Sequence, residues 1–317
     1  MKKLIAIIIS VIAGTTAYAQ QQAQFTQYMF NKTYINPAFT GSQKSINVLG
    51  AARFQWMGFK DSTGSTVNPR TFLFNFEAPL YSIKSGIGVS VEHDQLGYEK
   101  NLGIKLNYAF HQTIKKHHQL SFGLSMEILN KTIDFSKFSF FDAGDPLLAG
   151  LKEEGDIFTD MGVGINYYLK EKFYAGISVQ RVLSSNADIG VLEFNNVPHY
   201  YFITGYHFTL KEDKYNKIVL VTGLQAKSAG NQPGFEFHTL LRYNDKFWGG
   251  LMYRWDDAVG VIAGFSVKSL SIGASYDYTI SSFSNADSHG SPEVFVRYSY
   301  PLIQKIKMKG YYNPRYL

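Results

Sequence analysis

From Ser45 onward, apolar residues alternate with small or polar residues at a period of two. In residues 120–128, the apolar set is Leu120, Phe122, Leu124, Met126 and Ile128, and the set between them is Ser121, Gly123, Ser125 and Glu127. Successive side chains of a β-strand point to opposite faces, so this pattern predicts strands with one apolar and one polar face. Helical spacing is almost absent from this part of the chain.

About fourteen segments share the alternation, and many have the roughly 9 to 11 residues of a tilted membrane strand. They lie near residues 45–56, 70–79, 85–93, 102–114, 119–136, 159–169, 172–182, 200–210, 217–227, 234–243, 247–254, 258–267, 270–279 and 292–300. An even number of antiparallel strands can close on itself with both ends on one side. We therefore predict an all-β fold, a transmembrane antiparallel β-barrel of the outer membrane with about 14 strands.

The connections between these segments alternate between short and long. The expected short ones are 80–84, 114–118, 170–172, 211–216, 244–246 and 268–269; the expected long ones are 57–69, 94–101, 137–158, 183–199, 228–233 and 280–291, with 256–257 as a short exception. Outer-membrane barrels have short periplasmic turns and longer external loops. This alternation predicts that both ends of the mature chain are periplasmic.

The first nineteen residues have the features of an export signal. Lys2 and Lys3 precede the apolar stretch 4–13, and Ala17-Tyr18-Ala19 forms a small-x-small cleavage site. We expect cleavage after Ala19 and insertion in the outer membrane of a Gram-negative cell, in contact with its lipid. The expected divisions are a signal peptide (1–19), a periplasmic N-terminal segment (20–44), the barrel (45–300) and a basic periplasmic tail (301–317).

The segment 20–44 departs from the strand pattern. Its aromatic residues Phe25 and Tyr28 suit one or two helical turns, which Asn36-Pro37 would end. We predict that it packs at or inside the periplasmic mouth as a plug.

The inward-facing positions carry many glycines and charges of both signs. Those glycines, such as Gly86, Gly123 and Gly164, indicate either the bends of a closing barrel or a lumen cleared for a plug or a passing polypeptide. The inward charges are Glu92, Lys105, Glu127, Glu236, Arg242, Arg254, Asp277 and Arg297. Because both signs occur, we expect mutually paired lumen residues, since a selective ion filter would need a ring of one sign.

Composition and motifs argue against several chemistries. The chain has no cysteine, which excludes thiol nucleophiles, disulfides and cysteine-ligated zinc. Its net charge of +6 resides in Lys2, Lys3 and the last seventeen residues, so the barrel offers no basic face for nucleic acid. No nucleophile elbow, phosphate-binding glycine loop or zinc-protease motif occurs. We predict no enzyme activity and no catalytic, cofactor or metal site.

Several short motifs, taken in order along the chain, resemble one family. They are Gln27-Tyr28-Met29-Phe30-Asn31, Ile35-Asn36-Pro37-Ala38-Phe39-Thr40-Gly41, Arg53-Phe54-Gln55-Trp56-Met57-Gly58-Phe59, Gly86-Ile87-Gly88-Val89, His93-Asp94-Gln95-Leu96-Gly97, Leu120-Ser121-Phe122-Gly123, Trp248-Gly249-Gly250 with Tyr253-Arg254, and Tyr276-Asp277-Tyr278-Thr279. Their order and spacing resemble the PorP/SprF membrane proteins of the type IX secretion system. The run Gly290-Ser291-Pro292-Glu293 departs from the family's Gly-Ser-His-Glu-like run, and its proline suits the start of a strand.

The resemblance implies an outer-membrane accessory of protein export and, in relatives, of surface display of gliding adhesins. The implied partners are the periplasmic components PorE and PorK/PorN, or one large secreted client with a C-terminal sorting domain. The tail from Lys305 to Leu317 is the expected periplasmic docking element. The alternative function is a passive outer-membrane channel for small solutes.

The resemblance also singles out candidate residues. We expect structural or partner-contacting roles, and no catalytic role, for Asn36, Pro37, Gln55, Trp56, Asp94, Tyr253, Arg254 and Asp277.

Overall fold

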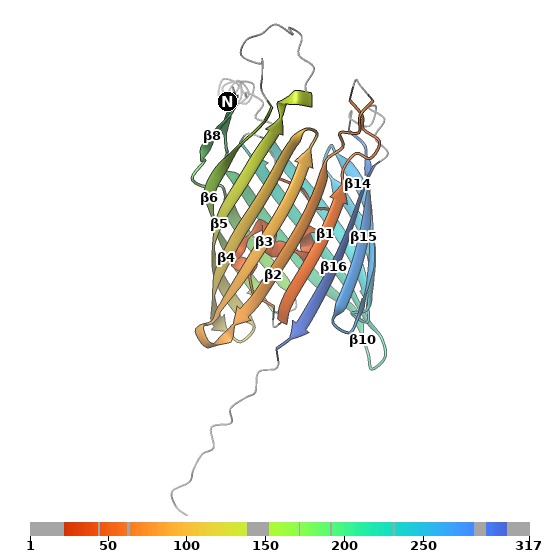
Figure 1. Ribbon diagram of the computed structural model, residues 1–317. Helices are drawn as coiled ribbons and strands as arrows, with labels where there is room; N and C mark the ends of the chain where they lie inside the picture. Colours follow the sequence, from red (N-terminus) through yellow and green to blue (C-terminus); the bar gives the residue numbers. More distant parts are fainter. Residues whose placement is uncertain are drawn as a thin grey trace, which may run out of the picture.

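A closed ring of backbone hydrogen bonds dominates the computed structural model, which describes residues 22–302 except 44, 62–63, 138–151, 171, 191, 231 and 282–289. Fourteen antiparallel strands form this barrel, and β1 pairs with both β2 and β16 to close it (Figure 1). The strands are β1 (Ser45–Phe54), β2 (Arg70–Leu80), β3 (Ser85–Leu96), β4 (Glu99–Lys115), β5 (His118–Asp134), β6 (Glu153–Leu169), β7 (Phe173–Gln180), β10 (His199–Glu212), β11 (Lys217–Ala229), β12 (Gln232–Tyr243), β13 (Phe247–Arg254), β14 (Ala258–Val267), β15 (Leu270–Thr279) and β16 (Ser291–Pro301). The predicted fold and strand number are confirmed.

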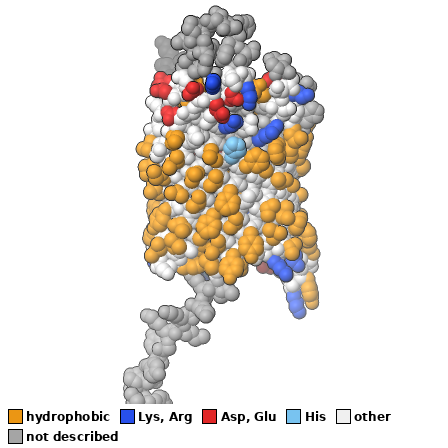
Figure 2. All heavy atoms as spheres, in the orientation of Figure 1, with side chains coloured by type: hydrophobic (Ala, Val, Ile, Leu, Met, Phe, Trp, Pro, Cys, Tyr) orange, Lys and Arg blue, Asp and Glu red, His pale blue; other side chains and the backbone are white. Residues whose placement is uncertain are grey.

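The period-two pattern of the sequence becomes an apolar outside and a mixed inside. On β2, Phe72 and Phe74 are exposed on the outer surface, whereas Leu73 and Asn75 between them are buried in the barrel. A broad band of apolar side chains covers the middle of the outer surface, and charged side chains gather above it (Figure 2). This arrangement is that of a barrel whose outer wall faces lipid. Among the described residues, no helix is long and apolar enough to cross a membrane.

The two ends of the barrel differ in their connections. At the long-connection end lie the described residues of four connections, 55–61 with 64–69, 135–137 with 152, 181–190 with 192–198, and 280–281 with 290. They include the 3-10 turn η4 (Phe135–Lys137) and a small hairpin of β8 (Asn186–Ile189) and β9 (Leu192–Asn195). At the opposite, short-turn end lie the turns that follow β2, β4, β6, β10, β12 and β14, including η3 (Tyr81–Ile83) after β2. The sequence did not predict the β8–β9 hairpin.

Two connections predicted to be long are short, and that prediction was wrong. β3 and β4 extend to a two-residue turn at Gly97-Tyr98 in place of the expected loop 94–101, and β11 and β12 replace the loop 228–233 with a turn that contains Gly230. Both glycines have positive φ, +60° for Gly97 and +57° for Gly230, a conformation that tight turns need and glycine adopts at low cost. The polar residues near these turns belong to strands that continue past the apolar band.

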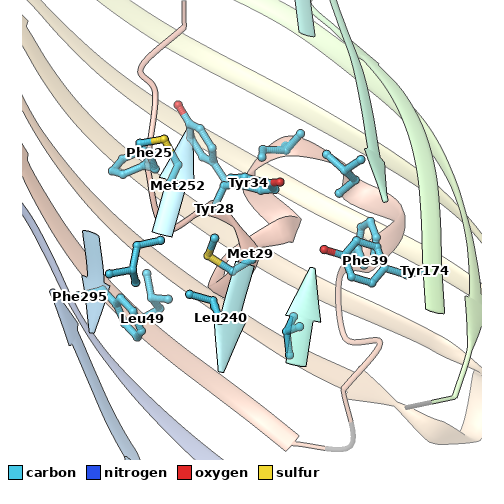
Figure 3. Close-up of a cluster of buried hydrophobic side chains, with 14 of the residues drawn as sticks. Phe25, Tyr28, Met29, Tyr34, Phe39, Leu49, Tyr174, Leu240, Met252 and Phe295 are labelled. Carbon is cyan, nitrogen blue, oxygen red and sulfur yellow. The ribbon is translucent and has the colours of Figure 1, made fainter. Parts of the chain in front are cut away.

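The N-terminal segment lies inside the barrel as three short helical turns. They are η1 (Tyr28–Phe30), α2 (Lys32–Ile35) and η2 (Pro37–Phe39). Its side chains Phe25, Tyr28, Met29, Tyr34 and Phe39 form the main hydrophobic core with inward residues of the strands (Figure 3). The core of the protein is therefore the contact between this segment and the wall.

The segment runs from one end of the barrel to the other. The backbone N–H of Gln22 donates to His199, the first residue of β10, at the long-connection end. The segment then reaches Ser45, which pairs with Pro301 at the short-turn end. We expected it at or inside one mouth and both chain ends on one side. Instead, Gln22 and Pro301 lie at opposite ends, because the segment follows the whole lumen before β1 begins.

The lipid-facing role of the outer wall can be tested at mid-strand. Leu124 is 45% exposed on the outer face of β5, midway along the apolar band. Replacing Leu124 by Arg should lower the free energy of unfolding in lipid vesicles by about 2–4 kcal/mol, because a charge at the membrane midplane loses its hydration. The matched change Ile114→Arg, near the short-turn end of β4, should cost about 0–1 kcal/mol. Equal losses for the two variants would contradict a lipid-facing Leu124.

Candidate functional site

The segment touches the wall where glycines leave room for its backbone. A Cβ atom on Gly86 would lie 2.1 Å from the carbonyl oxygen of Thr40, and one on Gly123 would lie 2.1 Å from the backbone nitrogen of Ala38. Real Cβ contacts are never so short, so any side chain at these positions would push the segment away. Of the two meanings left open for the inward glycines, a lumen cleared for a plug is confirmed at Gly86 and Gly123.

Asn36 and Pro37 hold the middle of the segment against β6 and β7. Asn36 is fully buried; its side-chain amide donates to the carbonyl oxygens of Ile165 and Ile177, at 3.2 and 3.0 Å. Its side-chain oxygen accepts from the backbone N–H of Ala38 at 2.9 Å and so caps η2, whose first residue is Pro37. The fixed φ of proline suits the first position of a helical turn. The Asn-Pro pair is thus the attachment point for one side of the wall.

A buried charge network holds the start of the segment to the opposite wall. The Arg53 guanidinium lies 2.8 Å from the Asp277 carboxylate and 3.1 Å from that of Glu293. It also donates to the Thr26 hydroxyl at 2.7 Å, and the Thr26 backbone N–H donates to Glu293 at 2.7 Å. Residues of β1, β15 and β16 therefore bind the segment through one shared set of hydrogen bonds.

Arg254 of β13 extends this network. Its guanidinium lies 2.7 Å from Glu236, 3.2 Å from Asp257 and 3.5 Å from Asp277. The expectation that inward charges pair with one another is confirmed at Arg254, Glu236 and Asp277. Removing one partner of a buried ion pair typically costs about 3–5 kcal/mol, because the other charge is left uncompensated. The segment is thus bound by interactions whose loss is costly.

The other candidate residues lie elsewhere. Gln55, Trp56 and Asp94 line a cavity of about 440 Å³ at the long-connection end. Trp56 has φ of +49° and its backbone N–H donates to the Ser291 hydroxyl at 3.0 Å, whereas Asp94 accepts from the Thr71 hydroxyl at 2.7 Å. Their placement makes them part of a vestibule and no part of the charge network.

Tyr253 points away from all of these residues. It is 38% exposed on the outer face of β13, and its ring centroid lies 6.2 Å from that of Trp255. An aromatic pair at the end of a strand matches the interfacial position of aromatic side chains in outer-membrane barrels. The lipid-facing wall is therefore its environment.

Sequence reasoning did not select Arg53, Thr26 or Glu293. Arg53 has the inward parity of Leu49 and Ala51 on β1, which could have identified it. Glu293 lies in the Gly290–Glu293 run, in which only Pro292 departs from the family pattern. Thr26 offered no periodic signal, because the segment is irregular.

The segment leaves a large cavity at each end of the lumen. The cavity of about 440 Å³ at the long-connection end includes Gln22 and Gln24 in its lining. A cavity of about 560 Å³ at the short-turn end includes Met29, Lys32 and Gln43. A third cavity of only about 30 Å³ lies between them and shares Gln24 with the first and Phe30 with the second, so the segment narrows the middle of the lumen to this small space.

The described residues contain no cluster of three or more His, Asp or Glu side chains arranged to hold a metal ion. That the chain has no catalytic, cofactor or metal site stays a prediction.

Comparison with known proteins identifies two kinds of likeness. A family model described as "Type IX secretion system membrane protein PorP/SprF" matches residues 17–298. No curated protein matches the chain. The toluene transporter TbuX of Ralstonia pickettii is similar in structure, with a TM-score of 0.51 and 10% identity over 86% of this chain and 93% of TbuX. The CymD monoaromatic hydrocarbon channel also has a TM-score of 0.51 and 10% identity, over 88% of this chain and 94% of CymD. At such identities the likeness shows the barrel fold alone.

The fit between segment and wall predicts how the lumen can be opened. In the double variant Gly86→Ala/Gly123→Ala, two new methyl groups would overlap the backbone at Thr40 and Ala38, each at a cost of about 1–3 kcal/mol. We expect the segment to leave the wall and single-channel conductance in planar bilayers to rise above that of the unaltered protein, as it should on deletion of residues 20–42. Gly103→Ala is the control, because its new Cβ would meet only the side chains of Leu129 at 3.5 Å and Glu127 at 3.8 Å, both ordinary van der Waals distances. Unchanged conductance in the double and deletion variants would contradict the plug.

Proposed function

Because the chain belongs to the PorP/SprF family of type IX secretion system membrane proteins, we propose that it is a plugged outer-membrane barrel that holds protein partners of that system. The single observation that carries this proposal is the lumen, which the N-terminal segment fills so far that only about 30 Å³ of space remains between the cavities at its two ends. A barrel closed in this way offers each side of the membrane a rigid surface and a vestibule. Such surfaces suit an accessory that binds proteins at its ends.

The alternative, a passive channel for small solutes, needs a continuous path. In this barrel an aromatic core and the ion pairs that bury Arg53, Asp277 and Glu293 narrow the middle of the path to a cavity of about 30 Å³. Opening it would require breaking buried ion pairs, at about 3–5 kcal/mol for each lost partner. The closed lumen thus favours partner binding over passive diffusion.

The connections support an orientation for the barrel. Outer-membrane barrels keep short turns in the periplasm and longer loops outside. We therefore assign the short-turn end to the periplasm, with Pro301 and the basic tail that follows it. The long-connection end, with Gln22 and its cavity, then faces the outside of the cell. Periplasmic partners such as PorE or PorK/PorN-like proteins would bind at the first end, and a secreted client with a C-terminal sorting domain at the second.

Cysteine labelling tests this orientation, since the chain has no cysteine of its own. Gln24 lines the cavity at the long-connection end and Gln43 lines the cavity at the short-turn end. On intact cells a membrane-impermeant maleimide should label Gln24→Cys and leave Gln43→Cys unlabelled, and both should react after the outer membrane is permeabilised. Tyr215→Cys, 75% exposed in a short turn, is the matched surface control and should behave like Gln43→Cys. The reverse pattern would overturn the orientation.

A pull-down from the native outer membrane in mild detergent tests the function itself. Recovery of PorE or PorK/PorN-like proteins would support an anchor for the periplasmic machinery, and recovery of one large secreted protein, such as a gliding adhesin, would support a dedicated partner. A variant that ends at Leu302 should lose the periplasmic proteins and keep a secreted client, because the basic tail is the expected docking element. A barrel recovered alone, together with normal secretion in its absence, would contradict the proposal and favour the channel.

A further inference from the structure

The lining of the cavity at the short-turn end carries an excess of positive charge. Its lining includes four cationic side chains and two acidic ones: Lys32, Lys170, Arg242 and Arg297 against Glu77 and Asp245. The cavity at the long-connection end has the opposite balance, with Lys227 and Arg254 against Asp94, Glu236 and Asp257. The two vestibules therefore differ in sign, although they belong to one barrel.

Both acids of the short-turn cavity already have partners. Glu77 accepts from the Thr33 hydroxyl at 2.7 Å, the Asn47 amide at 2.9 Å and the Gly41 backbone N–H at 3.2 Å. Asp245 lies 3.0 Å from the Lys217 ammonium and 3.5 Å from the Arg242 guanidinium. Neither carboxylate forms an ion pair with Lys32 or Arg297.

Lys32 is held in place by aromatic rings. Its ammonium lies 4.1 Å from the ring centroid of Tyr174 and 5.5 Å from that of Phe39. It forms no ion pair with any acidic side chain that the structure describes. Arg242 and Arg297 line the same cavity, so three cationic side chains share it with Lys32 among them.

Arg297 is also incompletely satisfied. Its guanidinium lies 5.9 Å from the Phe30 ring centroid, and its buried Nε atom has no hydrogen-bond partner among the described residues. Buried donors are normally paired, so a donor left over at the wall of a cavity indicates a place for an acceptor. An anion in the cavity would supply that acceptor and offset the positive charge of the three cations.

We propose that the short-turn cavity binds an acidic, extended segment of a partner protein, whose carboxylates contact Lys32, Arg242 and Arg297. A volume of about 560 Å³ is typical of a ligand pocket and exceeds what a single small ion fills. The protein's own tail is a poor occupant, although it follows Pro301 at this end. Its charges are Lys305, Lys307, Lys309 and Arg315, with no acid. This proposal rests on the orientation proposed above only for the location of the partner, which would be the periplasm.

The purified full-length barrel in detergent can test this directly. A fluorescein-labelled peptide of alternating Asp and Gly should bind by fluorescence anisotropy, and a matched peptide of Asn and Gly should not. Raising the ionic strength from about 0.05 to 0.5 M should weaken the binding, because salt screens the charges. Lys32→Gln and Arg297→Gln should each weaken it about tenfold, the effect expected when a hydrogen bond to a charged group is lost. Lys227→Gln, in the other cavity, is the control and should bind as the unaltered protein does.

A second measurement does not depend on those variants folding. The acidic peptide should slow maleimide labelling of Gln43→Cys in the short-turn cavity and leave that of Gln24→Cys unchanged. Equal binding of the neutral peptide, equal protection of both cysteines, or displacement by free aspartate at the same concentration as the peptide would each overturn the proposal. Because this assay uses the isolated barrel, its failure would leave the pull-down result and the proposed secretion role standing.

Discussion

Closure of the sheet is the constraint on which the structure depends. A strand at membrane depth cannot leave its backbone groups unpaired, since lipid offers them no hydrogen bonds. Pairing of β1 with β16 removes the last edge, but a ring of fourteen strands encloses more space than its own inward side chains fill. The segment 22–43 occupies that space. Because lipid requires the sheet to close, the closed barrel encloses a space that a separate segment must fill.

The same residues that close the ring also hold the segment. Arg53 and Glu293 face each other across the β1–β16 pairing, and both bind Thr26. A buried charge is tolerated only when it is paired. Arg53 therefore requires the β1–β16 pairing, which brings Glu293 beside it, and the Asp277 carboxylate. Barrel closure and segment attachment are therefore coupled through the side chains of Arg53 and Glu293.

The sequence predicted the fold closely because lipid enforces alternation along every strand. Loop lengths were predicted less well, since the strands continue past the apolar band toward Gly97 and Gly230, where no lipid imposes a pattern. At the candidate site, Arg254 and Asp277 were named from motifs and inward parity. Thr26 was not, because a segment that fills a lumen is shaped by its surroundings and carries no period of its own. The opposite charge balance of the two cavities was also not predicted, because closure of the barrel brings together lining residues that are far apart in the sequence.

The attachment of Thr26 has a consequence for biogenesis. Its hydrogen bond to Glu293 spans 267 positions, so an N-terminal residue binds to a strand that is synthesised among the last. Contacts between such distant positions form late, because a long loop must be closed before they stabilise anything. A chain cut short before β16 would lose both the strand that closes its sheet and the Glu293 carboxylate that binds the segment. The segment can therefore be held in the lumen through Thr26 only after the last strand has been synthesised and inserted.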